Sequence, residues 1–536
     1  MNDHDDTAVK ESISGSSDKS LAEIDIFSIH EQHAGRLVLD PTEARKEYGE
    51  VVASKLKLTQ DGKFVLWPQP TDDPEDPQNW SAGRKNVQLF IIILAAIVPD
   101  FDSGIGIASV FALSKQYHTT TGHINDLTSN WSIFLIGWGG IFFVMLMRRY
   151  GRLGTLFWTQ LLALGFLAGA TFAPTLKIFA AMRCLTAFFG TCPQATGLYT
   201  ITDLFPFHLQ ARKINIWTMG VVLAPHLSPF LFGFLVARTT WRWAYGIGCL
   251  YGLVVLVLIV FFMDESKYVR VARSDNSPPN PMRKGGFVYR LKDLIGITGV
   301  RSARKDPTWR EVLFAPLKIV WRPHLFLILI FEALVFGFGI GINVTNTIFL
   351  QSKPPLGFGL DQNTVSGIYA TPVIAVIIGE LLGRYLNDWV MNRELKRNNG
   401  VFEAEARLWT CYIGVSLYVI GFVILGSALQ NHLSKVVVIV GWAIAQVAVL
   451  VTTVAIYAYC TDCFPREQGE ISGLLNLFRT LGGFSVAFYQ IPWAEKHGAL
   501  QTLGCEAAIV AGCFLLVVPF LQWKGRSLRA KFSTSL

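Results

Sequence analysis

Charged residues are scarce in this chain. They make up 16% of its 536 residues, whereas hydrophobic residues make up 51% and the mean hydropathy is +0.39. An ordinary soluble chain carries about 25% charged residues, and a soluble core could not enclose this much apolar side chain. The composition therefore excludes an ordinary soluble protein.

Signatures of catalysis and metal binding are also missing. The eight cysteines are scattered along the sequence. Cys460 and Cys463 have C-x-x-C spacing, but no second pair or histidine accompanies them at zinc spacing. The sequence contains no P-loop, no H-E-x-x-H and no convincing nucleophile–base pair. We therefore expect no disulfide framework, no metal, no cofactor and no enzyme activity.

What the chain does contain is a series of apolar stretches, each long enough to cross a hydrocarbon layer about 30 Å thick as a helix. Short links separate them, except for one long link after the sixth. The pattern predicts an all-α integral membrane fold, with twelve transmembrane helices in two six-helix pseudo-repeat bundles, the layout of transporters built from repeated halves. We place the spans at 86–108, 129–147, 153–173, 176–197, 212–236, 243–263, 323–349, 365–386, 407–427, 434–457, 467–490 and 499–521.

The positive charges orient the chain. The formal net charge is +8, and the cations gather in alternate links and in the long central link. By the positive-inside bias, these links and both termini face the cytoplasm. Cations placed between spans account for the net charge without a nucleic-acid partner. We expect a multi-pass protein of the plasma membrane that contacts the lipid bilayer and works as a monomer.

The same pattern predicts the domain organisation. Residues 1–84 form a mostly disordered cytoplasmic arm, and residues 522–536 form a cytoplasmic tail. The arm lacks the apolar region of a signal peptide, so the first span serves as an uncleaved signal. The two bundles occupy residues 85–263 and 323–521. The central loop, 264–322, is cytoplasmic and contains a candidate interfacial helix from Pro307 to Val320.

Short basic or acidic links follow the second and eighth spans, at matching places in the two halves. With the layout of six plus six spans, they resemble the major facilitator superfamily, whose loop after the second helix follows G-x-x-x-D-R-x-G-R-R. Arg149, Gly151 and Arg152 fit this motif. Arg148 stands in the place of the Asp, a charge reversal that puts the family's cytoplasmic salt-bridge latch in question. In the second half Asp388 fits the acidic position.

Further segments carry the same resemblance. Arg183 in the fourth span is similar to the family's fourth-helix Arg motif. Gly220 and Pro225 in the fifth span fit a degenerate version of the antiporter motif G-x-x-x-G-P-x-x-G-G. The string from Arg397 to Leu408 resembles fungal drug:proton antiporters with twelve spans and their relatives. The resemblance covers about residues 73–521 and implies a secondary transporter.

Three of the carboxyl groups inside the predicted spans are candidates for a functional role. Ionisable side chains at the bilayer centre cost about 2.5 to 3.5 kcal/mol on insertion scales, so each needs a partner or a use. Asp100 and Glu332 lie in the first helix of each half. A carboxyl group in apolar surroundings can exchange a proton near neutral pH, so both are candidate proton carriers, with a structural role as the alternative. For Asp102 the alternative is a solvated helix end or a cap of the adjacent glycine-rich turn.

Other polar residues in the spans are candidates for a cavity or for charge pairs. Arg183 can hold an anionic substrate or pair with a buried acid. Arg479 can do the same, although a bond to Asn476 or to a carbonyl is its simpler role. His226 can titrate near physiological pH or can simply be hydrogen-bonded.

Two sequons fall at the predicted outer surface and make Asn130 and Asn343 candidate glycosylation sites. Both lie close to the membrane, where modification is hindered. A third sequon, at Asn79, lies on the predicted cytoplasmic side, which rules it out.

The leading functional hypothesis is proton-coupled efflux of a small organic compound, such as a drug or secondary metabolite, by alternating access. Uptake of a small polar or cationic solute together with protons is the main alternative, because related carriers run in that direction with similar motifs. A more remote alternative is a transporter-like nutrient sensor. A sensor should have a much longer cytoplasmic tail and should lack cavity charges, neither of which the sequence suggests.

Overall fold

The structure is a computed structural model that describes residues 40–268, 287–303, 308–354, 357–397, 403–464 and 467–533. Those ranges are almost entirely helical, and they contain no β-strand beyond an isolated bridge between Leu58 and Val65. Long apolar stretches fold this way because a helix satisfies its backbone hydrogen bonds internally, as a lipid environment requires. The predicted all-α fold is confirmed.

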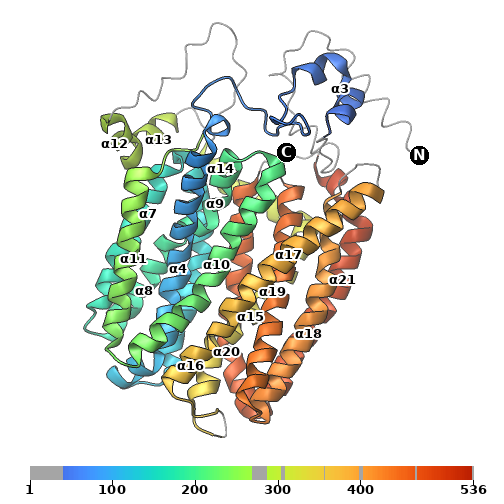
Figure 1. Cartoon of the computed structure of the whole chain (residues 1–536). Coiled ribbons are helices and arrows are strands. Elements are labelled where there is room, and N and C mark those ends of the chain that lie inside the picture. The colour runs from blue at the N-terminus through green and yellow to red at the C-terminus, as the bar shows by residue number, and fades with distance from the viewer. Residues whose placement is uncertain are drawn as a thin grey trace.

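Six membrane-crossing segments form the N-terminal bundle, drawn in blue to light green in Figure 1. The second segment is a continuous run of two short elements and a 20-residue helix, and the fourth consists of two helices. In chain order the elements are α4 (Ala82–Gln116), α5 (Thr121–Asn125), η2 (Asp126–Asn130), α6 (Trp131–Tyr150), α7 (Leu153–Thr171), α8 (Leu176–Gly190), α9 (Cys192–Leu204), α10 (Phe207–Val236) and α11 (Trp241–Phe262).

Six further segments form the C-terminal bundle, drawn in yellow to red in Figure 1. Short elements precede the second and third segments of this half. In chain order the elements are α15 (Pro323–Gln351), α16 (Gln362–Ile368), α17 (Ala370–Arg397), η3 (Ala404–Leu408), α18 (Trp409–Gln430), α19 (Lys435–Cys463), α20 (Gln468–His497) and α21 (Ala499–Ser533).

The count of twelve agrees with the sequence prediction. Within the described residues, 11 helical segments are long and apolar enough to cross a membrane alone. The fourth predicted span is divided at Thr191, because Pro193 lies in the first turn of α9 and starts a new helix there. Helices α8 and α9 have 15 and 13 residues, so each is too short to span a bilayer, but together they cross it.

The link after the second span, predicted to be cytoplasmic, is shaped by a glycine. Helix α6 ends at Gly151, whose φ of 97° lies in the left-handed region, which a residue without Cβ adopts at little cost. The chain then turns directly into α7. This sharp corner places the predicted motif residues Arg149 and Arg152 on either side of it.

The arm and the central loop add helices at one end of the molecule (Figure 1). The predicted disorder of the arm falls largely on residues 1–39, outside the described residues; residues 40–84 include α3 (Pro41–Lys55) and a short 3₁₀ helix, η1 (Pro77–Asn79). The central loop contains α12 (Phe287–Ile295), α13 (Ile297–Ser302) and α14 (Trp309–Val320). Helix α14 is the predicted interfacial helix, and it begins with a capping box made by Thr308 and Glu311.

The two bundles meet along two seams. In one, α6 and α9 pack against α20; in the other, α10 packs against α16 and α17. Small residues allow the close approach: a Cβ on Gly140 would lie 2.8 Å from the Asn476 amide nitrogen. Aromatic contacts between Trp131 and Phe484 extend the α6–α20 seam toward the predicted outer end. The interior of this seam contains the candidate site.

Candidate functional site

A small cavity lies between the bundles at mid-depth. Its volume is about 40 Å³, enough for roughly one or two water molecules, whereas a drug-sized ligand needs roughly 300 Å³ or more. Contacts therefore nearly fill the space in this conformation, and a substrate requires the bundles to move apart. The lining residues are Asp100, Ser103, Gly104, Ile107, Ile133, Ile136, Gln194, Val221 and Pro225 from the N-terminal bundle, and Phe336, Ile340, Asn343, Val344, Asn476, Arg479 and Thr480 from the C-terminal bundle.

The C-terminal bundle contains a buried ion pair whose cation, Arg479, lines this cavity. Nε of Arg479 on α20 lies 3.6 Å from Oε1 of Glu332 on α15. The same carboxylate oxygen accepts a 3.0 Å hydrogen bond from the Thr453 hydroxyl. Arg479 also donates to the Tyr457 hydroxyl at 3.2 Å. Thr453 on α19 and Arg479 on α20 thus hold the Glu332 carboxylate. Tyr457, also on α19, helps to position the Arg479 guanidinium beside it.

The guanidinium of Arg479 also lies over an aromatic ring. Its central carbon is 3.5 Å from the centroid of the Phe336 ring, a geometry in which the ring's electrons attract the cation. Both residues line the cavity. Arg479 is therefore a fixed positive charge at the cavity wall, held by an acid on one side and by a ring on the other.

The N-terminal bundle contributes an acid to the opposite wall. Asp100 on α4 accepts a short hydrogen bond from the side-chain amide of Gln194. Gln194 stands in the first turn of α9 because the helix break at Thr191 and Pro193 places it there. Arg479 attracts the Asp100 carboxylate across the interface. Acid and cation thus come from different bundles and face the same space.

Asp102 and Arg183 lie elsewhere, inside the N-terminal bundle. Both are buried, at 1% exposure each, and neither lines the cavity. Both Asp102 oxygens, and two Arg183 nitrogens, lack a hydrogen-bond partner among the described residues, although Arg183 lies near the Tyr245 ring. The alternative that Asp102 sits at a solvated helix end was wrong, because α4 continues to Gln116 and Asp102 is buried inside the bundle.

The simpler predicted role of Arg479 was also wrong. It does not bond to Asn476 in the described structure. Instead the Asn476 amide donates across the bundle interface, to the Ile136 carbonyl at 3.3 Å and to the Thr191 hydroxyl at 3.4 Å. Asn476 thus joins α20 to the second and fourth segments of the other bundle, beside the cavity.

The antiporter-like residues on α10 lie beside the cavity or against α4. Pro225 lines the cavity, and its carbonyl accepts a 3.1 Å bond from the Asn343 amide of the other bundle. A Cβ on Gly220 would lie 2.9 Å from Ile93, so α4 and α10 pack tightly there. His226 is fully buried, with its Nδ1 3.0 Å from the Val222 carbonyl, which fits the hydrogen-bonded interpretation.

The two glycosylation candidates are buried. Asn343 was expected near the outer surface, but it lines the central cavity and is 1% exposed. Asn130 is 0% exposed, and its amide donates to the Asp126 carboxylate at 2.8 Å. The folded structure therefore gives no support to glycosylation at either position.

A second polar site joins the bundles at the predicted cytoplasmic end. Arg148 on α6 forms an ion pair with Glu470 on α20, and the Tyr199 hydroxyl on α9 donates to the other Glu470 oxygen at 2.9 Å. Glu470 is 2% exposed. The charge reversal at Arg148 is therefore matched by an acid from the opposite bundle. We call Arg148, Tyr199 and Glu470 the cytoplasmic gate.

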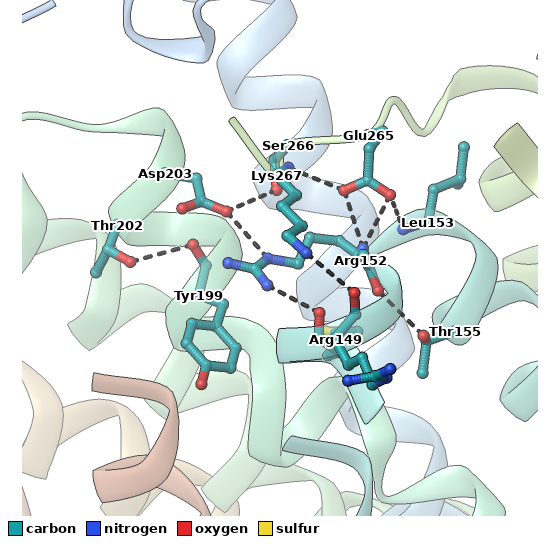
Figure 2. Close-up of polar contacts among 12 residues, drawn as sticks. Arg149, Arg152, Leu153, Thr155, Tyr199, Thr202, Asp203, Glu265, Ser266 and Lys267 are labelled. Carbon is teal, nitrogen blue, oxygen red and sulfur yellow. Dashed lines mark hydrogen bonds and ion pairs between the residues drawn. The ribbon is translucent and has the colours of Figure 1, made fainter. Parts of the chain in front are cut away.

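The motif corner contacts Tyr199 of this gate (Figure 2). Nε of Arg152 lies 3.1 Å from an Asp203 oxygen, and its guanidinium stacks 4.3 Å from the centroid of the Tyr199 ring. Glu265, just after the N-terminal bundle, accepts 2.9 Å bonds from the backbone N–H groups of Arg152 and Leu153. These N–H groups belong to the start of α7, which favours a negative charge.

Other motif positions contribute backbone or stacking contacts. Lys267 donates to the Arg149 carbonyl at 3.0 Å (Figure 2). The Arg149 guanidinium lies 5.0 Å from the centroid of the Trp309 ring on α14. The corner is thus tied to the central loop as well as to the gate.

The second half contains an ion pair like that of Arg152 and Asp203, but it does not involve the predicted residue Asp388. Asp388 forms no ion pair among the residues that the structure describes. Instead Arg407, at the start of the third segment of this half, lies 3.0 Å from Asp462 at the end of the fourth. The sequence signal was available: Thr-Asp-x-Phe-Pro occurs at 202–206 and again at 461–465. Each Asp of this repeat pairs with an Arg at the start of the preceding segment.

Comparison with known proteins identifies the family to which this chain belongs. The sequence profile described as Major Facilitator Superfamily matches residues 91–487. The MFS transporter fsa7 of a Fusarium species is 23% identical over 484 residues, covering 89% of this chain and 91% of the relative. A protein named efflux pump radE, from Floropilus chiversii, is 21% identical and covers 88% of this chain and 86% of itself.

Solved structures agree in fold. The xylose transporter XylE from E. coli, in a partially occluded inward-open conformation, aligns with a TM-score of 0.54 at 15% identity, covering 82% of this chain and 99% of XylE. The human organic anion transporter MFSD10 aligns with a TM-score of 0.55 at 12% identity, covering 81% of this chain and 99% of its own. At these identities the likeness concerns the arrangement of helices and not the cargo.

Proposed function

This chain belongs to the major facilitator superfamily, and from that premise we propose that it exports a small organic compound in exchange for protons. It is a multi-pass integral membrane protein of a transporter family. Its placement in the plasma membrane, with both termini in the cytoplasm and as a working monomer, is part of the proposal. The basic links between spans support this orientation.

One observation carries the proposal. Asp100 of one bundle and Arg479 of the other line the central cavity, and Glu332 forms an ion pair with Arg479. When all three are ionised, this group of side chains has one more negative than positive charge. A proton that binds there changes the balance of attraction between the bundles. The site therefore has the parts that proton-coupled alternating access requires.

The coupling follows from the shared position of Arg479. Protonation of Glu332 removes the charge that holds the guanidinium, which is then attracted more strongly to Asp100. Asp100 becomes less available to a bound substrate, so a proton that enters from outside favours substrate release there. Deprotonation toward the cytoplasm restores the ion pair and frees Asp100 for the next substrate molecule.

The gates supply the alternation. Opening toward the cytoplasm requires separation of Arg148 from Glu470. Opening toward the outside requires separation of contacts such as the 3.3 Å bond from the Gln362 amide to the Ala108 carbonyl. Both sets of contacts are present here, which fits a state between the two openings.

The name of the relative radE supports export as the direction. The test uses inside-out membrane vesicles with an acidic lumen, which corresponds to the outside of the cell. The probes are ethidium, Nile red and fluorescein, which are cationic, neutral and anionic. We expect accumulation of at least one probe that depends on the pH gradient. Accumulation only when the gradient is reversed would indicate proton-coupled uptake, the alternative direction.

The matched variants are Glu332→Gln and Glu506→Gln. Glu506 is also fully buried in the C-terminal bundle, but it bonds to Gln490 at 3.0 and 3.1 Å. Gln490 does not line the cavity, whereas Arg479, the partner of Glu332, does. Gradient-driven accumulation should fall by about tenfold or more in Glu332→Gln, equivalent to about 1.4 kcal/mol. It should persist in Glu506→Gln. Equal loss in both variants would contradict a specific role for Glu332.

A further inference from the structure

The helices of the central loop leave apolar side chains uncovered. In α12 and α13 these include Val288, Leu291 and Val300, which are 63%, 42% and 55% exposed. In α14 they include Phe314 and Leu317, at 49% and 52%. We call α12, α13 and α14 the cytoplasmic collar. A row of exposed apolar residues on surface helices normally marks a binding surface.

The collar is fixed against the predicted cytoplasmic ends of the transmembrane helices. The indole N–H of Trp158 on α7 donates to the Ile295 carbonyl at 3.1 Å. Arg290 donates to the Val260 and Met263 carbonyls at the end of α11. Gly296 approaches Gly154 of α7 closely, at 2.8 Å from a Cβ placed on Gly154. These contacts set α12 and α13 at the level where α7 and α11 leave the hydrocarbon.

The neighbouring transmembrane surface is lipid-facing. Trp158 is 45% exposed and lies one to two turns inside α7, a depth at which tryptophan marks the membrane–water interface. Phe261 and Phe262, at the end of α11, are 62% and 56% exposed. The contacts of α12 with α7 and α11 place the exposed apolar residues of α12 beside this surface, so lipid covers them more naturally than a soluble partner would.

The collar is also basic. Four exposed cations, Lys292, Arg301, Arg310 and Lys318, form no ion pair with any described residue. The two described acids are engaged locally: Asp293 accepts a bond from Thr298, and Glu311 completes the capping box of α14. Unpaired cations beside exposed apolar residues match the anionic headgroups of a cytoplasmic leaflet.

We propose that the cytoplasmic collar is a binding site for anionic phospholipid, with its apolar residues in the acyl boundary and its four free cations on the headgroup phosphates and carboxylates. The site rests on the orientation given in the proposed function, with the collar at the cytoplasmic leaflet, and it is independent of which compound is transported and in which direction. It concerns a lipid surface and not the central cavity.

The collar is connected to the cytoplasmic gate. The Trp309 ring of α14 packs 5.9 Å from the Tyr150 ring and under the Arg149 guanidinium, and Arg148 of the gate is the preceding residue. Helix α14 contacts α6, α15 and α20, so it touches both bundles. Lipid bound to α14 therefore adds to the contacts that keep α6 and α20 together, and anionic lipid should slow opening toward the cytoplasm.

The test compares the full-length wild type with Lys292→Gln/Arg301→Gln/Arg310→Gln/Lys318→Gln. The matched control removes four exposed cations at the opposite end, Lys115→Gln/Lys177→Gln/Lys435→Gln/Lys496→Gln. Native mass spectrometry counts the phosphatidylserine and phosphatidylcholine that remain bound after purification from a mixed bilayer. Since each basic residue near an anionic surface contributes roughly a fivefold preference, the wild type and the control should retain phosphatidylserine at least about fivefold over phosphatidylcholine. The collar variant should retain the two lipids about equally.

Inorganic phosphate, added in the same experiment, separates a membrane headgroup from a free ion. It should not displace phosphatidylserine if the apolar residues share in the binding, and displacement would overturn the lipid assignment. The proposal is also overturned if the wild type shows no preference or if the collar variant keeps it. A second variant, Leu291→Ser/Phe314→Ser, should weaken retention of both lipids while leaving the charge unchanged.

Discussion

The two bundles hold their buried charges in different ways. In the C-terminal bundle Glu332 and Arg479 form an ion pair, and Arg479 lines the cavity. In the N-terminal bundle Asp102 and Arg183 are comparably buried, but they form no ion pair within the described chain and neither lines the cavity. The acid of this bundle that lines the cavity is Asp100, and its hydrogen-bond partner is the neutral amide of Gln194.

This difference shows how a transporter built from two similar halves can acquire an asymmetric site. One half supplies a cation that is already neutralised, and the other supplies an acid whose nearest opposite charge belongs to its partner. When the bundles are together, Arg479 therefore attracts Asp100 across the interface as well as Glu332 within its own bundle, and the attraction to Asp100 is lost when the bundles separate. A proton on either side changes the force between the halves, which is the property that proton-driven movement needs.

The largest effect should come from Arg479→Leu. Removal of the guanidinium leaves Glu332 buried without its cation, and breaking a buried pair in this way costs about 3–5 kcal/mol. We expect lower thermal stability and loss of transport. The double variant Arg479→Leu/Glu332→Leu should recover most of the stability but no transport. Thermal unfolding of the purified proteins, with transport measured in parallel, separates the contribution of Arg479 to stability from its contribution to transport. Full transport by the double variant would contradict the account.

The two acids of α4 offer a sharper contrast. Asp100→Asn should reduce gradient-driven transport by about tenfold or more, equivalent to about 1.4 kcal/mol, because the acid at the cavity is lost. Asp102→Asn should change it less than about threefold, or about 0.7 kcal/mol on the same scale. Initial rates in vesicles, normalised to the amount of folded protein, make the comparison. The reverse order of effects would move the proton site from Asp100 at the cavity wall to Asp102 in the interior of the N-terminal bundle.

The close crossing of α15 and α20 holds the ion pair together. A Cβ on Gly337 would lie 2.6 Å from the backbone of Gly482, and overpacking of this kind costs about 1–3 kcal/mol. Gly337→Ala should therefore lower stability and transport by separating Glu332 from Arg479. Gly512→Ala is the control, because nothing lies within 4 Å of its added Cβ. Equal melting temperatures for the two variants would show that α15 and α20 can move apart at this crossing without loss of stability.

The smallest effect should come from the cytoplasmic gate. Arg148→Glu places two acids together, and because the Arg148 side chain is 37% exposed, the screened pair contributes about 1 kcal/mol or less. The variant should shift the population toward the cytoplasm-open state, measured by distances between spin labels on α6 and α20. Arg148→Glu/Glu470→Arg should restore the wild-type distances. Unchanged distances in Arg148→Glu would show that the Arg148–Glu470 pair does not keep α6 and α20 together.

Much of the fold was predictable because lipid imposes a simple rule. Each apolar stretch had to become a helix, so all twelve segments were found near their predicted places. The division of the fourth segment at Thr191 was not predicted, although Pro193 was a visible signal for it. That division matters because it positions Gln194 against Asp100.

The site was less predictable because side chains on different helices meet only in three dimensions. Asp100 and Glu332 could be singled out as acids in apolar stretches. The pairing of Glu332 with Arg479 required the α15–α20 crossing, and nothing in the sequence marked it. Glu470 lies at the start of a span, where an acid is unremarkable, so its pairing with Arg148 was missed. The repeated Thr-Asp-x-Phe-Pro string was the one sequence signal that could have located Asp203 and Asp462.

The most direct test of the central claim is to measure proton movement itself. Purified protein in liposomes that contain a pH-sensitive dye would receive a gradient of whichever probe the wild type transports. The account predicts probe-driven proton flux in the wild type and in Glu506→Gln, and none in Glu332→Gln. Undiminished proton flux in Glu332→Gln would contradict it, because the paired acid at the cavity would then have no part in coupling.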